Sequence, residues 1–119
     1  MDLEELRQYL LGKPGAVEDR PFDPELPAYK VMGKMFALIW AQDDPPRLNL
    51  KCGPFHAELL RETFSAVNPG YHMNKRHWNT VTLDGSVPDD VLKDMIDESY
   101  DLVVSGLTCA VQAKLDALA

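Results

Sequence analysis

The feature that most constrains the fold is the strictly alternating segment Arg47-Leu48-Asn49-Leu50-Lys51. A period of two is typical of a strand, so the two leucines should lie on one face and the polar side chains on the other. Buried leucines need cover, and we therefore expect helices packed against the face that carries Leu48 and Leu50. The opposite face should then be free for binding.

Other periodic segments supply elements that fit around this strand. Helical patterns cover residues 2–11, 54–67, about 88–103, and a final stretch after Gly106 that is either a short helix or a kinked continuation. Strand patterns cover residues 29–32, 35–41, 47–51 and 78–83, and residues 16–20 could add a short edge strand. Short connections favour antiparallel neighbours, so we predict one α+β domain over residues 1–119, a two-layer sandwich with helices on one face of an antiparallel sheet.

Length and composition exclude several classes of protein. The chain has 119 residues, 45% of them hydrophobic, and a net charge of −7, which indicates a globular domain rather than a disordered or fibrous chain. The apolar run over residues 35–41 is far shorter than the roughly 20 residues of a membrane span, and no signal-peptide pattern follows Met1. Two cysteines fit neither a disulfide framework nor a zinc cluster. We expect a cytoplasmic protein without cofactor or metal.

The charge is unevenly distributed along the chain. Residues 1–25 contain three basic and seven acidic groups, residues 26–82 contain seven and four, and residues 83–119 contain two and eight. The middle segment alone has a positive balance, and it also contains all three histidines. The negative total argues against indiscriminate binding to nucleic acid or an anionic membrane. Any anionic partner should therefore meet the middle segment.

The candidate binding chemistry lies in residues 68–79, which combine two histidines, three asparagines, Lys75, Arg76, a tyrosine and Trp78. If Trp78 shares a sheet face with Arg47 and Lys51, basic groups flank an aromatic ring. Such a surface binds phosphates through charge-assisted hydrogen bonds and stacks a planar ring. Two plainer interpretations stay open: Trp78 is equally suited to the core, and the strand cations could be only solvated charges.

Signals for metal binding and catalysis are weak. The spacing of His72 and His77 fits no metal-ligand set, and His56, on the exposed side of a helix, is assigned no role. The chain has no Gly-rich phosphate loop, no nucleophile elbow and no paired carboxylates in its basic segment. We therefore assign no catalytic residue. A Lys, His and Tyr cluster could still serve acid–base chemistry, which leaves an enzyme as an alternative.

Several short motifs occur in order along nearly the whole chain. They are Lys13-Pro-Gly15, Arg20-Pro-Phe22, Val31-Met-Gly-Lys-Met-Phe-Ala37, Leu48-Asn-Leu-Lys-Cys52, Pro69-Gly-Tyr-His-Met-Asn-Lys-Arg-His-Trp-Asn-Thr80 and Asp97-Glu-Ser-Tyr-Asp-Leu-Val103. Together they resemble the MmcQ/YjbR-like family. The resemblance implies a CyaY-like fold and, through a double-wing motif proposed from fold comparison, DNA binding. The family's polar motif positions correspond to Lys34, Lys51, His72, Asn74, Lys75, Trp78, Ser99 and Tyr100.

The sequence therefore predicts a monomer that binds DNA weakly. The residues assigned to phosphate contact, stacking or polar readout are Lys34, Arg47, Lys51, His72, Asn74, Lys75, Arg76, Trp78 and Tyr100. The alternative is that the same cluster lines a concave pocket for a small phosphorylated or carboxylated ligand. A third interpretation is structural: these polar side chains fix the loop over residues 68–77 and bind nothing.

Overall fold

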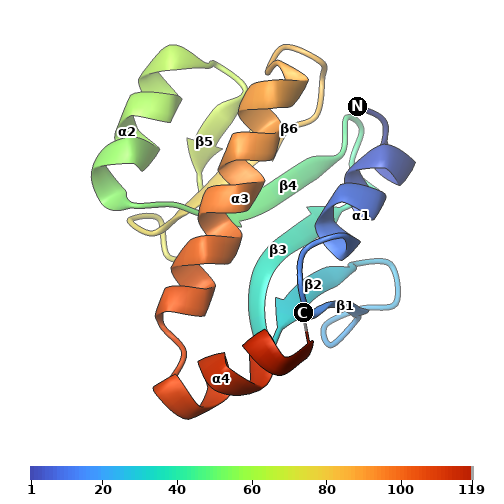
Figure 1. The fold of residues 1–119 in the computed structure, drawn as a ribbon. Helices are drawn as coiled ribbons and strands as arrows, with labels where there is room; N and C mark the ends of the chain where they lie inside the picture. The colour runs from blue at the N-terminus through green and yellow to red at the C-terminus, as the bar shows by residue number, and fades with distance from the viewer. Residues whose placement is uncertain (119) are drawn as a thin grey trace.

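A computed structural model describes residues 1–118, which form four helices and six strands (Figure 1). The helices are α1 (Leu3–Leu11), α2 (Pro54–Thr63), α3 (Asp89–Ser105) and α4 (Cys109–Leu118). The strands are β1 (Ala16–Asp19), β2 (Ala28–Val31), β3 (Lys34–Trp40), β4 (Arg47–Lys51), β5 (Val67–Pro69) and β6 (Trp78–Thr82). In this part of the chain, no helix combines the length and the apolar character that crossing a membrane requires.

The six strands form one sheet in the order β1-β2-β3-β4-β6-β5, and every neighbouring pair is antiparallel. Helices α1, α2 and α3 pack against the same face of this sheet, with α3 crossing its centre (Figure 1). The predicted α+β sandwich is confirmed, and so is the predicted facing of β4. Leu48 and Leu50 are buried in the core beneath the helices, together with Ile39, Val81 and Ile96.

Local sequence signals account for several element boundaries. Helix α1 begins at a capping box, in which the Asp2 carboxylate accepts the Glu5 backbone N–H and the Glu5 carboxylate accepts the Asp2 N–H. Pro54 occupies the start of α2, where a missing N–H costs nothing. The predicted edge strand over residues 16–20 is present as β1, and the chain after Gly106 forms a separate helix, α4.

Two details of the second helix differ from the sequence prediction. The helix ends at Thr63, and its inward side chains are Ala57 and Leu60, whereas Phe55 and Leu59 are 91% and 57% exposed. Periodicity shows that a helix has an apolar stripe, but it does not say which apolar residues the sheet covers. Val67–Pro69 forms strand β5, which no strand pattern predicted and which pairs with β6 at the sheet edge.

The face of the sheet opposite the helices is not free, contrary to the sequence prediction. The loop over residues 70–77 folds back across it, and Asn49 is completely buried as a result. Asn49 donates from Nδ2 to the Tyr71 carbonyl (3.0 Å) and accepts from Thr80 Oγ1 (2.6 Å), while the Tyr71 N–H donates to Thr80 Oγ1 (2.7 Å). The covered part of this face is therefore a hydrogen-bonded layer between β4, β6 and the loop.

Candidate nucleic-acid interface

Three strand termini meet at one end of the sheet. Because β3 and β6 both run opposite to β4, the start of β3 (Lys34), the end of β4 (Lys51) and the start of β6 (Trp78) lie together. Lys51 and Trp78 are direct cross-strand partners, so their side chains lie on the same face. We call this region, with the adjoining residues Lys75–His77, the basic end. The condition stated in the sequence analysis, that Trp78 shares a sheet face with the polar residues of β4, is therefore met.

Two lysines of the basic end line one open hollow of about 300 Å³. Lys34 lies beside the β2–β3 turn and is exposed, and Lys51 is half-buried. The remaining lining residues come from β3 and the C-terminal end of α3: Met35, Leu102, Val103, Gly106 and Leu107. Within residues 1–118 neither ammonium group forms an ion pair. Both charges are therefore available to a partner.

The backbone that carries Lys51 is held by a buried serine of α3. Ser99 Oγ accepts the Lys51 N–H (2.8 Å) and donates to the Phe36 carbonyl (2.5 Å). One hydroxyl thus bridges β3 and β4, close to the start of β3 and the end of β4. Ser99 acts as a positioning residue for the basic end, a role consistent with its place in the helix stripe.

The loop before β6 presents further cations. Lys75 and Arg76 are exposed, and Trp78 is half-buried. Lys75 Nζ donates to the Gly70 carbonyl (3.1 Å), whereas the Arg76 guanidinium has no hydrogen-bond or ion-pair partner within the described chain. Asn74 fixes the turn, because its side-chain oxygen accepts the Arg76 N–H (2.9 Å). Asn74 therefore shapes the loop.

Arg61 of α2 is a part of this region that the sequence analysis missed. Its guanidinium donates to the Asn79 side chain (2.7 Å), to the Trp78 carbonyl (3.3 Å) and to the Lys75 carbonyl. These bonds attach the loop and the start of β6 to α2, and no carboxylate within the described chain neutralises the charge. A single Arg on an amphipathic helix gives no sequence signal for this role, because its partners are carbonyls.

Other predicted site residues lie elsewhere. Arg47 is at the opposite end of β4, where Asp43 binds it at 2.8 and 2.7 Å and the Tyr71 ring stacks beneath its guanidinium at 4.1 Å. The Asp43 hydrogen bond raises the pKa of Arg47. His72 packs against Tyr71 and Trp40, with ring centroids 4.1 and 5.7 Å apart. His72, Tyr71 and Trp40 thus form an aromatic cluster, and Arg47 stacks on its Tyr71 ring.

Tyr100 is buried in the core beneath α3 and does not line the hollow of the basic end. It is 7% exposed on the helix side, where its hydroxyl donates to the Pro14 carbonyl (2.6 Å) and its ring packs edge-on against Phe36. Burial raises the pKa of this phenol. Tyr100 is therefore removed from the candidate interface. Its motif position reflects packing between α3 and the N-terminal segment.

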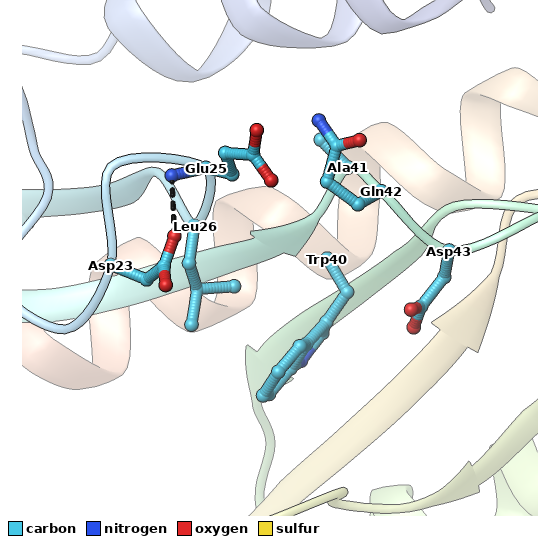
Figure 2. Close-up of a pocket in the computed structure, with 7 residues that line it drawn as sticks. All are labelled: Asp23, Glu25, Leu26, Trp40, Ala41, Gln42 and Asp43. Carbon is cyan, nitrogen blue, oxygen red and sulfur yellow. Dashed lines mark hydrogen bonds between the residues drawn. The ribbon is translucent and has the colours of Figure 1, made fainter.

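The opposite end of the same sheet carries acidic groups, and we call it the acidic end. A hollow of about 240 Å³ there is lined by Asp23, Glu25, Leu26, Trp40, Ala41, Gln42 and Asp43 (Figure 2). Asp44 and Asp84 lie in the adjoining turns. The carboxylates would repel a phosphate group, so this hollow is unsuited to an anionic ligand.

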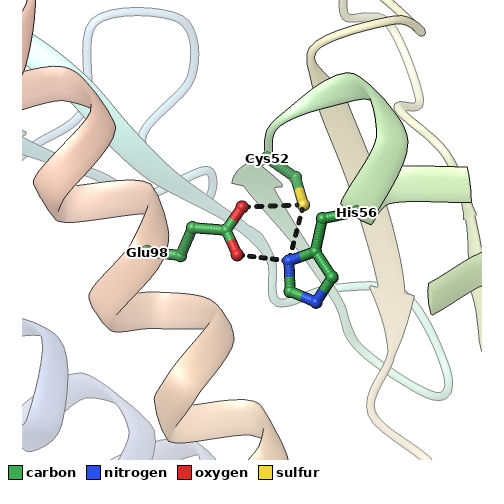
Figure 3. A group of neighbouring side chains, drawn as sticks. All are labelled: Cys52, His56 and Glu98. Carbon is green, nitrogen blue, oxygen red and sulfur yellow. Dashed lines mark hydrogen bonds and ion pairs between the residues drawn. The ribbon is translucent and has the colours of Figure 1, made fainter. Parts of the chain in front are cut away.

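A second cluster also escaped the sequence analysis. Cys52, His56 and Glu98 come together where β4 leads into α2 and passes α3 (Figure 3). Burial and the Glu98 carboxylate raise the pKa of the Cys52 thiol to about 12. Burial opposes ionisation of Glu98, but hydrogen bonds from Cys52, Gly53 and His56 outweigh it and lower the pKa of Glu98. The four-residue spacing of Cys52 and His56 was visible in the sequence, whereas Glu98 is distant along the chain.

Comparison with known proteins places the chain among a set of similar sequences. The sequence model of the YjbR family matches residues 11–102. YjbR of Escherichia coli K12 is 41% identical over 105 residues, which cover 88% of this chain and 89% of that protein. YbdF of Escherichia coli O157:H7 is 39% identical over 73% of this chain and 71% of its own length. Neither name states a molecular role.

Solved structures of similar sequence have the same fold as this chain. A crystal structure of a Deinococcus radiodurans protein with a DUF419 domain superposes with a TM-score of 0.90 at 40% identity, covering 96% of this chain and 87% of that one. A Pseudomonas syringae protein superposes with a TM-score of 0.75 at 27% identity, covering 86% and 98%. The two-layer arrangement is thus common to the chain and its relatives.

Proposed function

The chain belongs to the YjbR family, and from that premise we propose that it binds nucleic acid weakly through the basic end. The observation that carries this proposal is the clustering of unpaired cations. Arg7, Lys13, Arg20, Lys30 and Arg47 each form an ion pair with a carboxylate, and none of them belongs to the basic end. Lys34, Lys51, Lys75 and Arg76 form none within residues 1–118. Lys93 and Lys114 are unpaired there as well, but each is the only basic residue of its helix, α3 or α4.

A half-exposed ring beside these cations supports the same function. Trp78 stands next to Lys51 across the strand pair, so a phosphate held by Lys51 would bring a neighbouring base within reach of the indole. Stacking on an aromatic ring is tolerant of base identity and needs an unpaired base. We therefore expect single strands to bind better than duplex, without strong sequence preference.

The number of cations limits the affinity. Contact with about three to five phosphates gives a shallow dependence on salt, and the chain's net charge of −7 opposes approach. The dissociation constant should be on the order of micromolar or weaker at physiological salt. A small phosphorylated ligand in the hollow between Lys34 and Lys51 is the alternative that shares this chemistry.

Fluorescence anisotropy with labelled single- and double-stranded oligonucleotides at two salt concentrations tests the proposal. The Lys34→Ala/Lys51→Ala variant should lose most of the salt-dependent binding. The matched control Lys93→Ala/Lys114→Ala removes the same charge from the helices α3 and α4 and should bind as the parent does. Equal losses in both variants would show a non-specific charge effect and would reject the basic end.

Competition separates the two ligand classes. Inorganic phosphate and a nucleoside monophosphate are added to the oligonucleotide complex at matched phosphate concentration. We expect each to displace the oligonucleotide only at concentrations far above the oligonucleotide's own dissociation constant. Displacement by either small molecule at an equal or lower concentration would assign the hollow to a small anion and reject the nucleic-acid function.

A further inference from the structure

Cys52, His56 and Glu98 converge from three separate elements. Cys52 follows β4, His56 lies in the first turn of α2, and Glu98 lies in the middle of α3 (Figure 3). The ligand-capable atoms of the three residues are all within 4.8 Å of one another. We propose that these side chains form a binding site for one thiophilic divalent cation, of which Zn²⁺ is the natural occupant.

The distances approach those of a tetrahedral zinc site. Bond lengths of about 2.0 to 2.3 Å place neighbouring ligand atoms roughly 3.3 to 3.6 Å apart. Cys52 Sγ is 3.7 Å from His56 Nδ1, which matches this spacing. The sulfur is also 3.1 Å from Glu98 Oε2, the oxygen that accepts the Gly53 N–H, and Oε1 of the same carboxylate faces His56. His56 Nδ1 and Glu98 Oε1 are in direct hydrogen-bond contact and would have to separate slightly around a metal. Both side chains are partly exposed, 46% and 27%, so a rotation of either can provide that movement.

The chemistry of the three groups selects the kind of cation. A thiolate, an imidazole nitrogen and a carboxylate are the three ligand types that zinc accepts, whereas Mg²⁺ and Ca²⁺ require oxygen ligands. Binding breaks the Cys52 S–H bond, forms a metal–sulfur bond and releases one proton to solvent. Three protein ligands leave a fourth position, and the exposure of His56 lets water fill it.

Glu98 has a structural task as well, and the metal site is compatible with it. The Gly53 N–H donates to Glu98 Oε2 (3.1 Å), and Gly53 is the N-cap of α2, which has no side chain of its own to cap the helix. The carboxylate thus compensates for the positive end of that helix. Oε1 can ligate the metal while Oε2 keeps the Gly53 bond, so metal binding would tie α2 to α3 more firmly.

Cobalt titration of the reduced, chelator-treated full chain tests this proposal directly. Co²⁺ should produce thiolate-to-metal charge-transfer absorption together with the visible bands of a tetrahedral site, saturating at one ion per chain. Zn²⁺ should displace the colour stoichiometrically. No charge-transfer band, or a band that saturates at two ions per chain, would overturn the proposal.

Variants assign the ligands. Cys52→Ser should abolish the charge-transfer band, while Cys109→Ser, the matched control at the exposed second cysteine, should leave it unchanged. His56→Gln should weaken Co²⁺ binding by at least roughly tenfold, since loss of even an outer-shell partner costs 10- to 100-fold. His56 is exposed, so this variant also serves if Cys52→Ser fails to fold. A band lost with Cys109→Ser, or unchanged affinity in His56→Gln, would show that the metal binds elsewhere.

Discussion

The two ends of the central strands differ sharply in charge although they share one sheet. At the acidic end Asp43 neutralises Arg47 of β4, and further carboxylates lie near Trp40. At the basic end Lys34 and Lys51 have no carboxylate partner within residues 1–118. Arg47 and Lys51 are four residues apart along β4, or about 13 Å, which is longer than the roughly 8 Å over which physiological salt screens a charge. Each end therefore presents its own field, and the net charge of the chain describes neither.

The largest expected effect is the loss of stability when a charge is placed in the apolar core, which should be the same near both ends of β4. Leu48 and Leu50 are equally buried, at 0% and 1% exposure. Leu48→Asp and Leu50→Asp should each cost more than about 4 kcal/mol, because an unpaired charge enters the core, and the domain should unfold. Circular dichroism and urea denaturation measure this. Tolerance of one substitution but not the other would mean that the core is open at one end.

The next largest effect is the loss of stability on replacing a glycine by alanine, which should be greater at Gly70, beside Trp78, than at Gly85, in the turn at the acidic end. A Cβ at Gly70 would lie 2.8 Å from the Trp78 Cβ and 2.9 Å from its carbonyl oxygen, so Gly70→Ala should cost roughly 3 kcal/mol. Gly85 has a positive φ but nothing within 4 Å, so Gly85→Ala should cost about 1 kcal/mol of backbone strain. Urea midpoints give both values. Equal costs would contradict the tight attachment of the loop to β6.

The paired and unpaired cations of β4 should differ modestly in stability. Arg47→Ala removes the Asp43 ion pair and the stacking on Tyr71 and should cost about 1 kcal/mol. Lys51→Ala removes a charge with no partner and should change stability by less than about 0.5 kcal/mol. Thermal melts of the two variants decide this. A greater loss of stability in Lys51→Ala than in Arg47→Ala would show that Lys51 stabilises the fold, contrary to its assignment as a ligand-binding residue.

The smallest effect is the pH response of one turn at the acidic end. Hydrogen bonds from the Ser86 hydroxyl and N–H lower the pKa of Asp84. The bonds favour the carboxylate, so their stabilising effect is complete above the ordinary aspartate pKa and declines as the pH falls through the lowered value. An NMR titration should show the lowered pKa, and Ser86→Ala should move it back toward the ordinary value. An unchanged Asp84 pKa in Ser86→Ala would refute the hydroxyl's role.

Local patterns in the sequence were sufficient for much of the fold. The alternation around Leu48 and Leu50 predicted both a strand and its buried face, and the helical pattern over residues 2–11 predicted α1. Such features depend on neighbours in the chain. The exposure of Phe55 followed from tertiary packing instead, because α2 turns Ala57 and Leu60 toward the sheet and leaves Phe55 outside the core. Periodicity alone could not reveal that choice.

The candidate site was predictable in part for the same reason. Strand alternation placed Lys51 on the polar face of its own strand and left open whether Trp78 shares that face, and the structure pairs the two residues directly. The burial of Asn49 required the loop over residues 70–77 to fold back on the sheet, and the cluster at Cys52 required Glu98 from another helix. Both depend on contacts between segments far apart in the chain, and the local patterns of a single sequence do not reveal such contacts.

Mapping amide chemical shifts in the isotope-labelled chain during titration with a single-stranded oligonucleotide tests the central claim most directly. The largest changes should fall on Lys34, Lys51, Arg76 and Trp78, and they should diminish as salt is raised. The amides of Asp23, Asp43 and Asp84 should not move. Changes concentrated at the acidic end, or no salt-sensitive change at the basic end at millimolar oligonucleotide, would contradict the assignment of nucleic-acid binding to the basic end.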